Sequence, residues 1–293
     1  YAGNDPASLA SLIADRHVGS VLIIGKWTGG VASVRAAADQ LQGYAPGDNR
    51  LIISTDPEGG WVQHLIGPGF DRMPTAVDQG TMSTDQLRQS ASVWGSQLAA
   101  AGINVDLAPV LGTVVANRAA NAPIGALYRD FGLDAAGNAA QGTAFVQGMA
   151  DAGVQSAIKH YPGLGAVTGN TDFTADGILD TTTTLDGAEI KAFDTTIDQA
   201  DPAMVMMALA TYQAIDPNDP AVFSSIIIDG HLRGDLGYDG VVISDSMSAA
   251  AVSAYDTTQL GVKLVEAGGD LACIGDTNYV APILDGLSTR AAS

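Results

Sequence analysis

Two short apolar runs in this chain end abruptly in ionisable side chains. Lys159 and His160 follow one run and lead into a Pro-Gly pair, while Asp245 follows the run Val241–Ser244 and leads into small residues. The carboxyl end of a buried parallel strand has this pattern when it delivers a functional group into a pocket. Asp245 could attack a carbon that is losing its leaving group, or it could simply cap the following helix. The residue types alone leave both roles open.

A third apolar run, residues 51–54, also ends in carboxyl groups. Asp56 and Glu58 follow it, and a pair of glycines comes directly after them. An apolar run that ends in ionisable side chains and then in glycine or small residues therefore occurs at three separated places in the chain.

The elements that would position these groups can be recognised from periodicity. Amphipathic helical stretches, such as the face formed by Leu87, Ala91, Trp94 and Leu98, alternate with short β-rich runs. Alternation of this kind predicts βαβ units and a parallel sheet. The seven β-rich runs are residues 21–24, 51–54, 105–108, 155–158, 203–207, 241–244 and 271–274.

Two further helices are expected in the C-terminal half. Ile190, Phe193 and Ile197 share one helical face, and Ser224 is placed to cap a helix that ends at Gly237. No Pro/Ser-rich linker or change of composition divides the 293 residues, so residues 1–293 are predicted to form a single domain.

Composition excludes several classes of function. The net charge of −19 disfavours nucleic acids and anionic membranes as partners. The single cysteine, Cys273, excludes an intramolecular disulfide and a cysteine-based metal cluster. No apolar run is long enough to span a membrane, and no phosphate-loop, zinc-protease or serine-hydrolase motif occurs. We expect neither an organic cofactor nor a metal.

The motifs Lys159–Gly163 and Val242–Asp245 resemble those of the family 3 glycoside hydrolases. The resemblance runs from residue 17 to residue 270 and is greatest for the single-domain bacterial hexosaminidase-like branch. It implies a TIM-type (β/α)8 barrel that hydrolyses a β-linked glucoside or N-acetylglucosaminide with retention of configuration. Seven strands are recognisable here, and we expect the first strand of the family's barrel to be absent from this chain.

In that family the aspartate of the second motif is the nucleophile, which implies this role for Asp245. The lysine and histidine of the first motif bind sugar hydroxyls, which implies that Lys159 and His160 do so here. A lysine just past a strand end is rarely buried without a partner, so a carboxylate or a bound sugar should lie beside Lys159. Asp56 matches the family aspartate that chelates sugar hydroxyls, and Glu58 is expected to brace the loop.

Two further positions carry the resemblance less closely. Arg129 lies in Arg-Asp-Phe-Gly-Leu-Asp, which is similar to the family's Arg-Ser-Phe-Gly-x-Asp and implies substrate binding. Trp61 stands where the family has arginine. Its indole could stack on a pyranose face or pack under the loop. The barrel fold implies that Asp56, Arg129, Lys159, His160 and Asp245 line one concavity at the carboxyl ends of the strands.

The chain departs from the family at the second catalytic group. The hexosaminidase branch has Asp-Ser-His on a mobile loop, with the histidine as acid/base, and this chain has Asn170-Thr171-Asp172 there. Leu164 and Leu209 also stand where that branch or the family has histidine. The chain has only four histidines, and apart from His160, to which the resemblance already gives a sugar-binding role, none stands near that loop.

Two interpretations follow from this departure. Asp172 could replace the imidazole as general acid/base, which would restore the pair of carboxyls that most glycosidases use. Alternatively, the barrel could be a weak or inactive sugar- or cell-wall-binding protein that has kept its pocket. A carbohydrate is the expected ligand in both cases. We expect a secreted or cell-envelope protein. The cytoplasm is the alternative, because a mature secreted protein processed before Tyr1 would have the same sequence as a cytoplasmic one.

Overall fold

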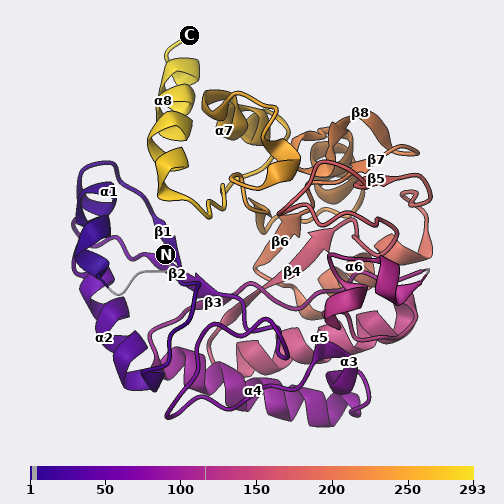
Figure 1. Cartoon of the computed structure of the whole chain (residues 1–293), viewed down its shortest axis with the longest axis horizontal. Helices are drawn as coiled ribbons and strands as arrows, with labels where there is room; N and C mark the ends of the chain where they lie inside the picture. The colour runs from indigo at the N-terminus through magenta and orange to yellow at the C-terminus, as the bar shows by residue number, and fades with distance from the viewer. Residues whose placement is uncertain (2–4, 116) are drawn as a thin grey trace.

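The computed structural model describes residues 1, 5–115 and 117–293 of the chain. Six parallel strands form a curled sheet in the order β1-β2-β3-β4-β6-β9, with helices along its outer side (Figure 1). The strands are β1 (Ser20–Leu22), β2 (Ile52–Thr55), β3 (Val105–Asp106), β4 (Gln155–Tyr161), β6 (Met204–Met207) and β9 (Val241–Ser244). The predicted parallel α/β architecture is therefore confirmed.

β6 and β9 are nearly continuous apolar runs, as expected where both faces of a sheet are covered. All four residues of β6 are buried, and they alternate between two clusters of apolar side chains. Met204 and Met206 join Val105 and Ile243 on the concave side, whereas Val205 and Met207 belong to the larger core beneath the helices. This alternation leaves the carboxyl ends of the strands free to present polar side chains.

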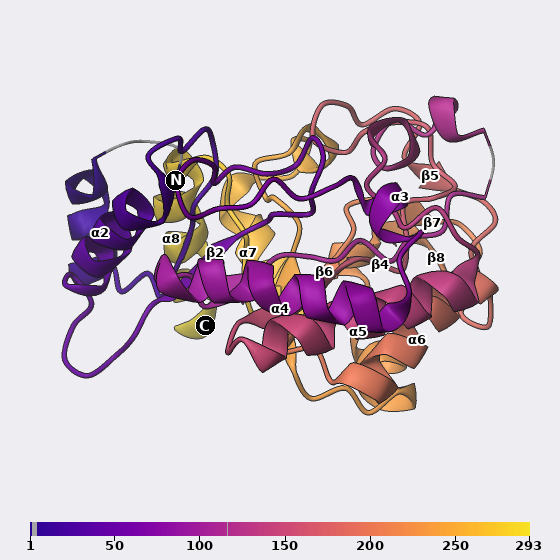
Figure 2. The same cartoon turned by 90° about the horizontal axis from the view of Figure 1, so that it is seen from below.

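The helices cover the convex side of the sheet, and α4, α5 and α6 lie side by side there (Figure 2). The helix α4 begins with a capping box between Ser83 and Gln86 and buries the expected face of Leu87, Ala91, Trp94 and Leu98. The longer helices are α2 (Gly30–Gln42), α4 (Thr84–Ala100), α5 (Ala135–Asp151), α6 (Ala188–Ala200), α7 (Thr257–Glu266) and α8 (Val280–Ala291). Shorter ones are α1 (Ala10–Ala14), α3 (Ala76–Gln79) and the turns η1 (Pro6–Leu9), η2 (Arg118–Ala120), η3 (Gly125–Leu127), η4 (Ala221–Phe223), η6 (Ala250–Val252) and η7 (Thr277–Tyr279).

The helix expected after Ser224 is present, but with π geometry. It is η5 (Ile226–Asp235), and the Ser224 hydroxyl accepts a hydrogen bond from Ile227 N at 3.3 Å. Gly237 follows its end with a positive φ of 67°. The sequence pattern predicted the helix and its two ends, while the wider turn depends on packing.

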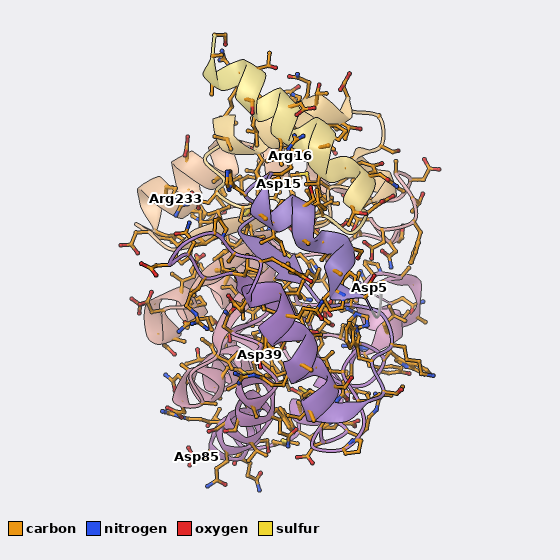
Figure 3. The ribbon with its side chains drawn as sticks, turned by 90° about the vertical axis from the view of Figure 1, so that its left-hand side faces the viewer. Asp5, Asp15, Arg16, Asp39, Asp85 and Arg233 are labelled. Carbon is orange, nitrogen blue, oxygen red and sulfur yellow. The ribbon has the colours of Figure 1, made fainter. Side chains whose placement is uncertain are left out.

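The seventh predicted run, residues 271–274, pairs with β9 only through a bridge between Ile243 and Leu271. The two ends of the sheet are joined by helices, because Arg16, just after α1, forms an ion pair with Asp285 of α8 at 2.6 Å. Figure 3 shows Arg16 beside α8. Whether the sheet closes as an eight-stranded barrel therefore stays a prediction.

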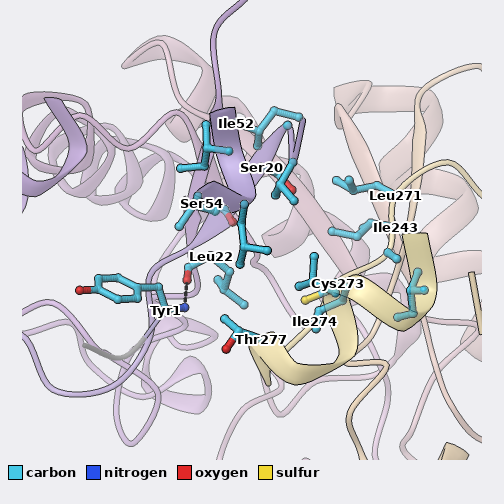
Figure 4. A pocket seen from close by; sticks show the side chains of 18 of the residues that line it. Tyr1, Ser20, Leu22, Ile52, Ser54, Ile243, Leu271, Cys273, Ile274 and Thr277 are labelled. Carbon is cyan, nitrogen blue, oxygen red and sulfur yellow. Dashed lines mark hydrogen bonds between the residues drawn. The ribbon is translucent and has the colours of Figure 1, made fainter. Parts of the chain in front are cut away.

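An apolar cavity of about 260 Å³ lies between β1 and the segment 271–274. Leu22 and Cys273 face it from the two sides, and the backbone of Tyr1 hydrogen-bonds to Leu22 and Ile24 along the edge of β1 (Figure 4). Burial raises the pKa of the Cys273 thiol to about 12, as is typical of an unreactive buried cysteine.

A second, small sheet was not expected from the sequence. It pairs β5 (Leu179–Asp180) with β7 (Thr211–Tyr212) and β7 with β8 (Asp216–Pro220). β8 reads Asp-Pro-Asn-Asp-Pro, which has no strand periodicity. None of the helices in the described part of the chain is long and apolar enough to cross a membrane.

Candidate active site

A second cavity, of about 240 Å³, opens at the carboxyl ends of the strands. Six of the seven site residues singled out in the sequence line it, although they come from distant parts of the chain. The expected common concavity is therefore confirmed. These six residues are Asp56, Arg129, Lys159, His160, Asp172 and Asp245.

Trp61 is the seventh. It does not belong to the lining of this cavity, and 77% of its surface is exposed. The indole is therefore not packed under the loop, and stacking on a sugar remains open as its role.

A tight turn after β2 brings the carboxyl groups of that strand end into the site. Gly59 has a φ of 98° and pairs with Val62 in both directions, so the chain folds back on itself. A Cβ at Gly59 would lie 2.1 Å from the Pro74 carbonyl oxygen, which only glycine avoids. The glycine pair in the sequence is thus needed for the geometry of the turn.

Glu58 is the centre of a buried ion-pair cluster. Both of its carboxylate oxygens accept hydrogen bonds from Arg129 at 2.7 Å, and Lys159 Nζ lies 2.6 Å from Oε1. Burial alone would raise the pKa of Glu58, but the charges of Arg129 and Lys159 lower it to about 2. Burial likewise opposes the charge on Lys159, whose pKa is nevertheless raised by Glu58 and Asp56. Glu58 braces the loop as expected and supplies the partner that Lys159 requires.

The loop that carries Arg129 is fixed by polar contacts. Arg118 forms two hydrogen bonds, of 2.6 and 2.7 Å, with the buried carboxylate of Asp130. The buried Asn121 amide donates to the carbonyls of Leu164 and Val167, both at 2.7 Å. Its oxygen accepts from the backbone at residues 124 and 125. Asn121 therefore ties the Arg129 loop to the segment that leads to Asp172.

Asp245 is held at the end of β9 by its backbone. Its N–H donates to the Met207 carbonyl at 3.0 Å, and one carboxylate oxygen accepts the Ser246 N–H at 2.7 Å. Burial raises the pKa of Asp245 to about 6, and the negative charge of Asp172 adds to the rise. The side chain is thus a poorly compensated carboxylate that points into the cavity.

His160 lies beside Asp245, with 3.9 Å between Nε2 and the nearer carboxylate oxygen. Burial, together with the positive charges of Arg129 and Lys159, lowers the pKa of His160 well below its usual value. The ring is therefore neutral, and its Nδ1 has no hydrogen-bond partner within residues 1, 5–115 and 117–293. A neutral imidazole in this position can donate to or accept from a ligand hydroxyl.

Asp172 lies on an exposed loop that is anchored next to the end of β9. The carbonyls of Thr171 and Asp172 accept hydrogen bonds from Ala251 N and Ala250 N, at 3.1 and 3.2 Å. The Asp172 N–H itself donates to Asn170 Oδ1 at 3.0 Å. The loop is thus attached to the segment that follows Asp245, and both carboxyl groups line the same cavity.

His64 was not singled out in the sequence, and the fold brings it into this cavity. Its Nε2 lies 3.1 Å from Asp56 Oδ1, and its Nδ1 lies 2.8 Å from the Gly25 carbonyl oxygen. The separation of eight residues from Asp56, across a glycine pair, is the only signal in the sequence that could have indicated this contact.

For metals, the described residues contain no group of three or more His, Cys, Asp or Glu side chains that could hold an ion.

Comparisons with known proteins agree with the geometry. The sequence model of the glycosyl hydrolase family 3 N-terminal domain matches residues 2–291. The chain is 32% identical to the β-hexosaminidase LpqI of Mycobacterium tuberculosis over 294 residues, which covers 97% of this chain and 72% of that protein. It is 31% identical to an uncharacterized secreted glycosyl hydrolase of Arthroderma benhamiae, covering 93% of this chain and 78% of that one. The crystal structure of a β-N-acetylhexosaminidase from Beutenbergia cavernae superimposes with a TM-score of 0.95 at 42% identity, covering 99% of this chain and 88% of that chain.

Proposed function

The chain belongs to glycosyl hydrolase family 3, and we propose that it releases β-linked N-acetylglucosamine from a glycan with retention of configuration. It is an O-glycosyl hydrolase of the β-N-acetylhexosaminidase type. The binding groups suit the hydroxyls of either sugar. The preference for N-acetylglucosamine over glucose therefore rests on the relatives, which are β-hexosaminidases.

In this proposal four side chains hold the sugar. Lys159 and Arg129 are fixed by Glu58 and present their remaining N–H groups to hydroxyl oxygens, while Asp56 accepts hydrogen bonds from the hydroxyls. The neutral ring of His160 completes the set. Because these charges are paired before the sugar arrives, little reorganisation is needed on binding.

Asp245 then attacks the anomeric carbon, and the bond to the leaving oxygen breaks as Asp172 gives that oxygen its proton. In the second half, Asp172 removes a proton from water, the water oxygen attacks the anomeric carbon, and Asp245 leaves as a carboxylate. Attack by Asp245 requires its ionised form. Within the described residues no lysine or arginine forms an ion pair with Asp245, and the nearby His160 is neutral, so no ion pair has to be broken before attack.

The convergence of Asp245 with the four binding residues in one cavity carries this proposal. The raised pKa of Asp245 also favours an enzyme over a binding protein, because a cavity that only binds a neutral sugar gains nothing from a destabilised carboxylate. That destabilisation is a cost which catalysis would justify.

Trapping of the intermediate tests the proposal. A 2-deoxy-2-fluoro glycoside with a dinitrophenolate leaving group should add one sugar mass to a peptide that contains Asp245, as measured by mass spectrometry after digestion. The Asp245→Ala variant should show no adduct and no turnover of 4-nitrophenyl N-acetyl-β-glucosaminide. Labelling of another residue, or turnover that survives in this variant, would refute the assignment.

Two further statements, one on the fold and one on the location of the protein, belong to the same proposal. We propose that the curled sheet is the wall of a (β/α)8-type barrel, in which the segment 271–274 is the neighbour of β9. We also propose that the protein acts outside the cytoplasm, which is supported by the name of its secreted relative. Fractionation of the source cells with an antibody against this chain would test the second statement.

A further inference from the structure

We propose that His64 is a positioning residue whose protonated ring holds Asp56 in place for the sugar, so that substrate affinity depends on the protonation of His64. This role rests on the proposed function, because Asp56 is the group through which His64 would act. It is a property of this chain's own side chains at the turn after β2.

The surroundings of the ring require two donors. Nδ1 faces the carbonyl oxygen of Gly25 at 2.8 Å, and Nε2 faces Asp56 Oδ1 at 3.1 Å. A neutral imidazole has only one N–H, so one of these contacts would place a lone pair against an oxygen. Only the imidazolium places an N–H and a positive charge against both oxygens, and the 3.1 Å contact with Asp56 Oδ1 is an ion pair and not an aligned hydrogen bond.

Among the residues that the structure describes, Asp56 has no closer cation than His64. Its Oδ2 lies 4.0 Å from Lys159 Nζ, but that ammonium is 2.6 Å from Glu58 and is engaged there. Loss of the proton from His64 would therefore leave Asp56 without a close positive partner. The carboxylate would be free to turn away from the position in which it receives sugar hydroxyls.

The backbone on both sides keeps the pair in register. Trp27 N donates to the His64 carbonyl at 3.0 Å, and Ile66 N donates to the Trp27 carbonyl at 2.8 Å. His64 is thereby fixed to the segment that follows β1, which also contains Gly25. The ring cannot leave Asp56 without breaking this pairing or changing its rotamer.

The proton on His64 can exchange with solvent, because 30% of the side chain is exposed, compared with 3% for Lys159. Partial burial opposes the charge, but Asp56 and the Gly25 carbonyl outweigh it and raise the pKa of His64. Lys159 acts in the opposite direction. The ring should thus be charged in mildly acidic solution and lose its proton as the pH rises.

Direct titration tests the ion pair without any substrate. The chain has four histidines, so the NMR signals of His64 can be assigned by comparison with the His64→Gln variant. His64 should titrate above the usual pH for histidine in the wild type and at lower pH in Asp56→Asn. An unchanged titration in Asp56→Asn would overturn the proposal.

Kinetics test the consequence for substrate. In wild type the KM for 4-nitrophenyl N-acetyl-β-glucosaminide should rise about tenfold as His64 loses its proton, with a smaller change in kcat. His64→Gln should show the high KM at every pH, whereas His64→Arg, a fixed cation, should lack the rise. A purely structural role would not make the two variants differ in their pH profiles.

The outcomes separate this inference from the proposed function. Hydrolysis whose KM has the same pH dependence in all three proteins would overturn the role of His64 and leave the enzyme assignment intact. The absence of hydrolysis and of N-acetylglucosamine binding at every pH would overturn the proposed function and the role of His64 together, even if the NMR titration showed the ion pair.

Discussion

Glu58 and Asp245 are carboxyl groups just beyond strand ends, Glu58 buried and Asp245 partly buried, yet their surroundings shift their pKa values in opposite directions. Burial acts against the charge of each, but Arg129 and Lys159 lower the pKa of Glu58 to about 2. In the described part of the chain, Asp245 has no cation as close as those beside Glu58. Burial, together with the charge of Asp172, raises the pKa of Asp245 to about 6. The carboxyl that only supports the site is charged at every working pH, while the proposed nucleophile can change its charge.

The difference shows how one cavity can combine rigid binding with reactive groups. On the side of β2 and β4, the buried cations Arg129 and Lys159 each lie within 2.7 Å of the Glu58 carboxylate. On the side of β9, Asp245 receives a backbone N–H and shares the cavity with a second carboxyl. Substitutions on the first side should therefore affect stability and binding, and those on the second side should affect turnover.

Asp172→Ala should give the largest effect that separates the two sides. Substrates with poor leaving groups need protonation of the departing oxygen, so their kcat/KM should fall by about 10²–10⁴-fold. Dinitrophenyl glycosides need little protonation and should be affected far less, and added azide should restore part of the rate. The measurement is a leaving-group series with wild type and variant.

Thr171→Ala serves as the control, because Thr171 lies next to Asp172 and its substitution leaves that carboxyl in place. An equal loss on both types of substrate would show that Asp172 is not the acid. No loss on either would show that Asp172 takes no part in turnover.

Glu58→Gln should mainly cost stability. It removes the partner of two buried cations, which lowers the free energy of unfolding by about 3–5 kcal/mol. The matched control is Glu266→Gln, which breaks an exposed pair with Arg290 of the same 2.7 Å length. That change should cost at most about 1 kcal/mol. Urea denaturation of the three proteins at pH 7 measures both values, and equal losses would contradict the distinction between the two pairs.

The lowered pKa of Glu58 also predicts how the free energy of unfolding depends on pH. The pKa of Glu58 is lowered from 4.5 to about 2, so the stabilisation it contributes is present above its unfolded value and is lost as the pH falls toward 2. Wild type should lose about 3 kcal/mol across this window because of Glu58. Glu58→Gln should lack that part of the acid transition.

Much of this arrangement could be predicted from the sequence, because strand ends are marked by a change from apolar to ionisable residues. Lys159 and Asp245 could be assigned to one edge of a parallel sheet without knowledge of their contacts. The partner of His64 could not be predicted, since it depends on how far the turn at Gly59 folds the chain back. The strand β8 was also missed, because its pairing depends on the neighbouring strand and not on its own side chains.

The acid limb of the activity profile should report on Asp245. Attack requires the carboxylate, and burial with the charge of Asp172 raises the pKa of Asp245 to about 6. At pH 5, kcat/KM should therefore be about a tenth of its plateau value. In Asp172→Asn, with dinitrophenyl substrates, the limb should move to lower pH because a negative neighbour has been removed. A limb that stays in place would mean that another group controls it.

The smallest expected effect concerns Asp106, a buried carboxyl that lies outside both sides of this comparison. It faces Thr55 and Ser156 across the neighbouring strands, and none of their side-chain oxygens has a hydrogen-bond partner in the described part of the chain. Burial raises the pKa of Asp106 well above its usual value, partly offset by the charge of Lys159. A carboxyl with a raised pKa favours folding at low pH, and that contribution is lost as the pH rises through the raised value.

Asp106→Asn replaces this group with a neutral amide of the same shape. At pH 5 its unfolding free energy should lie within about 1 kcal/mol of wild type. At pH 8 the variant should be the more stable protein, because wild type must then either bury a charge or hold a proton against the solution. Urea denaturation at the two pH values measures the difference. If wild type gains stability relative to the variant on going from pH 5 to pH 8, Asp106 is ionised and paired in the folded protein, and it belongs with the charges around Glu58.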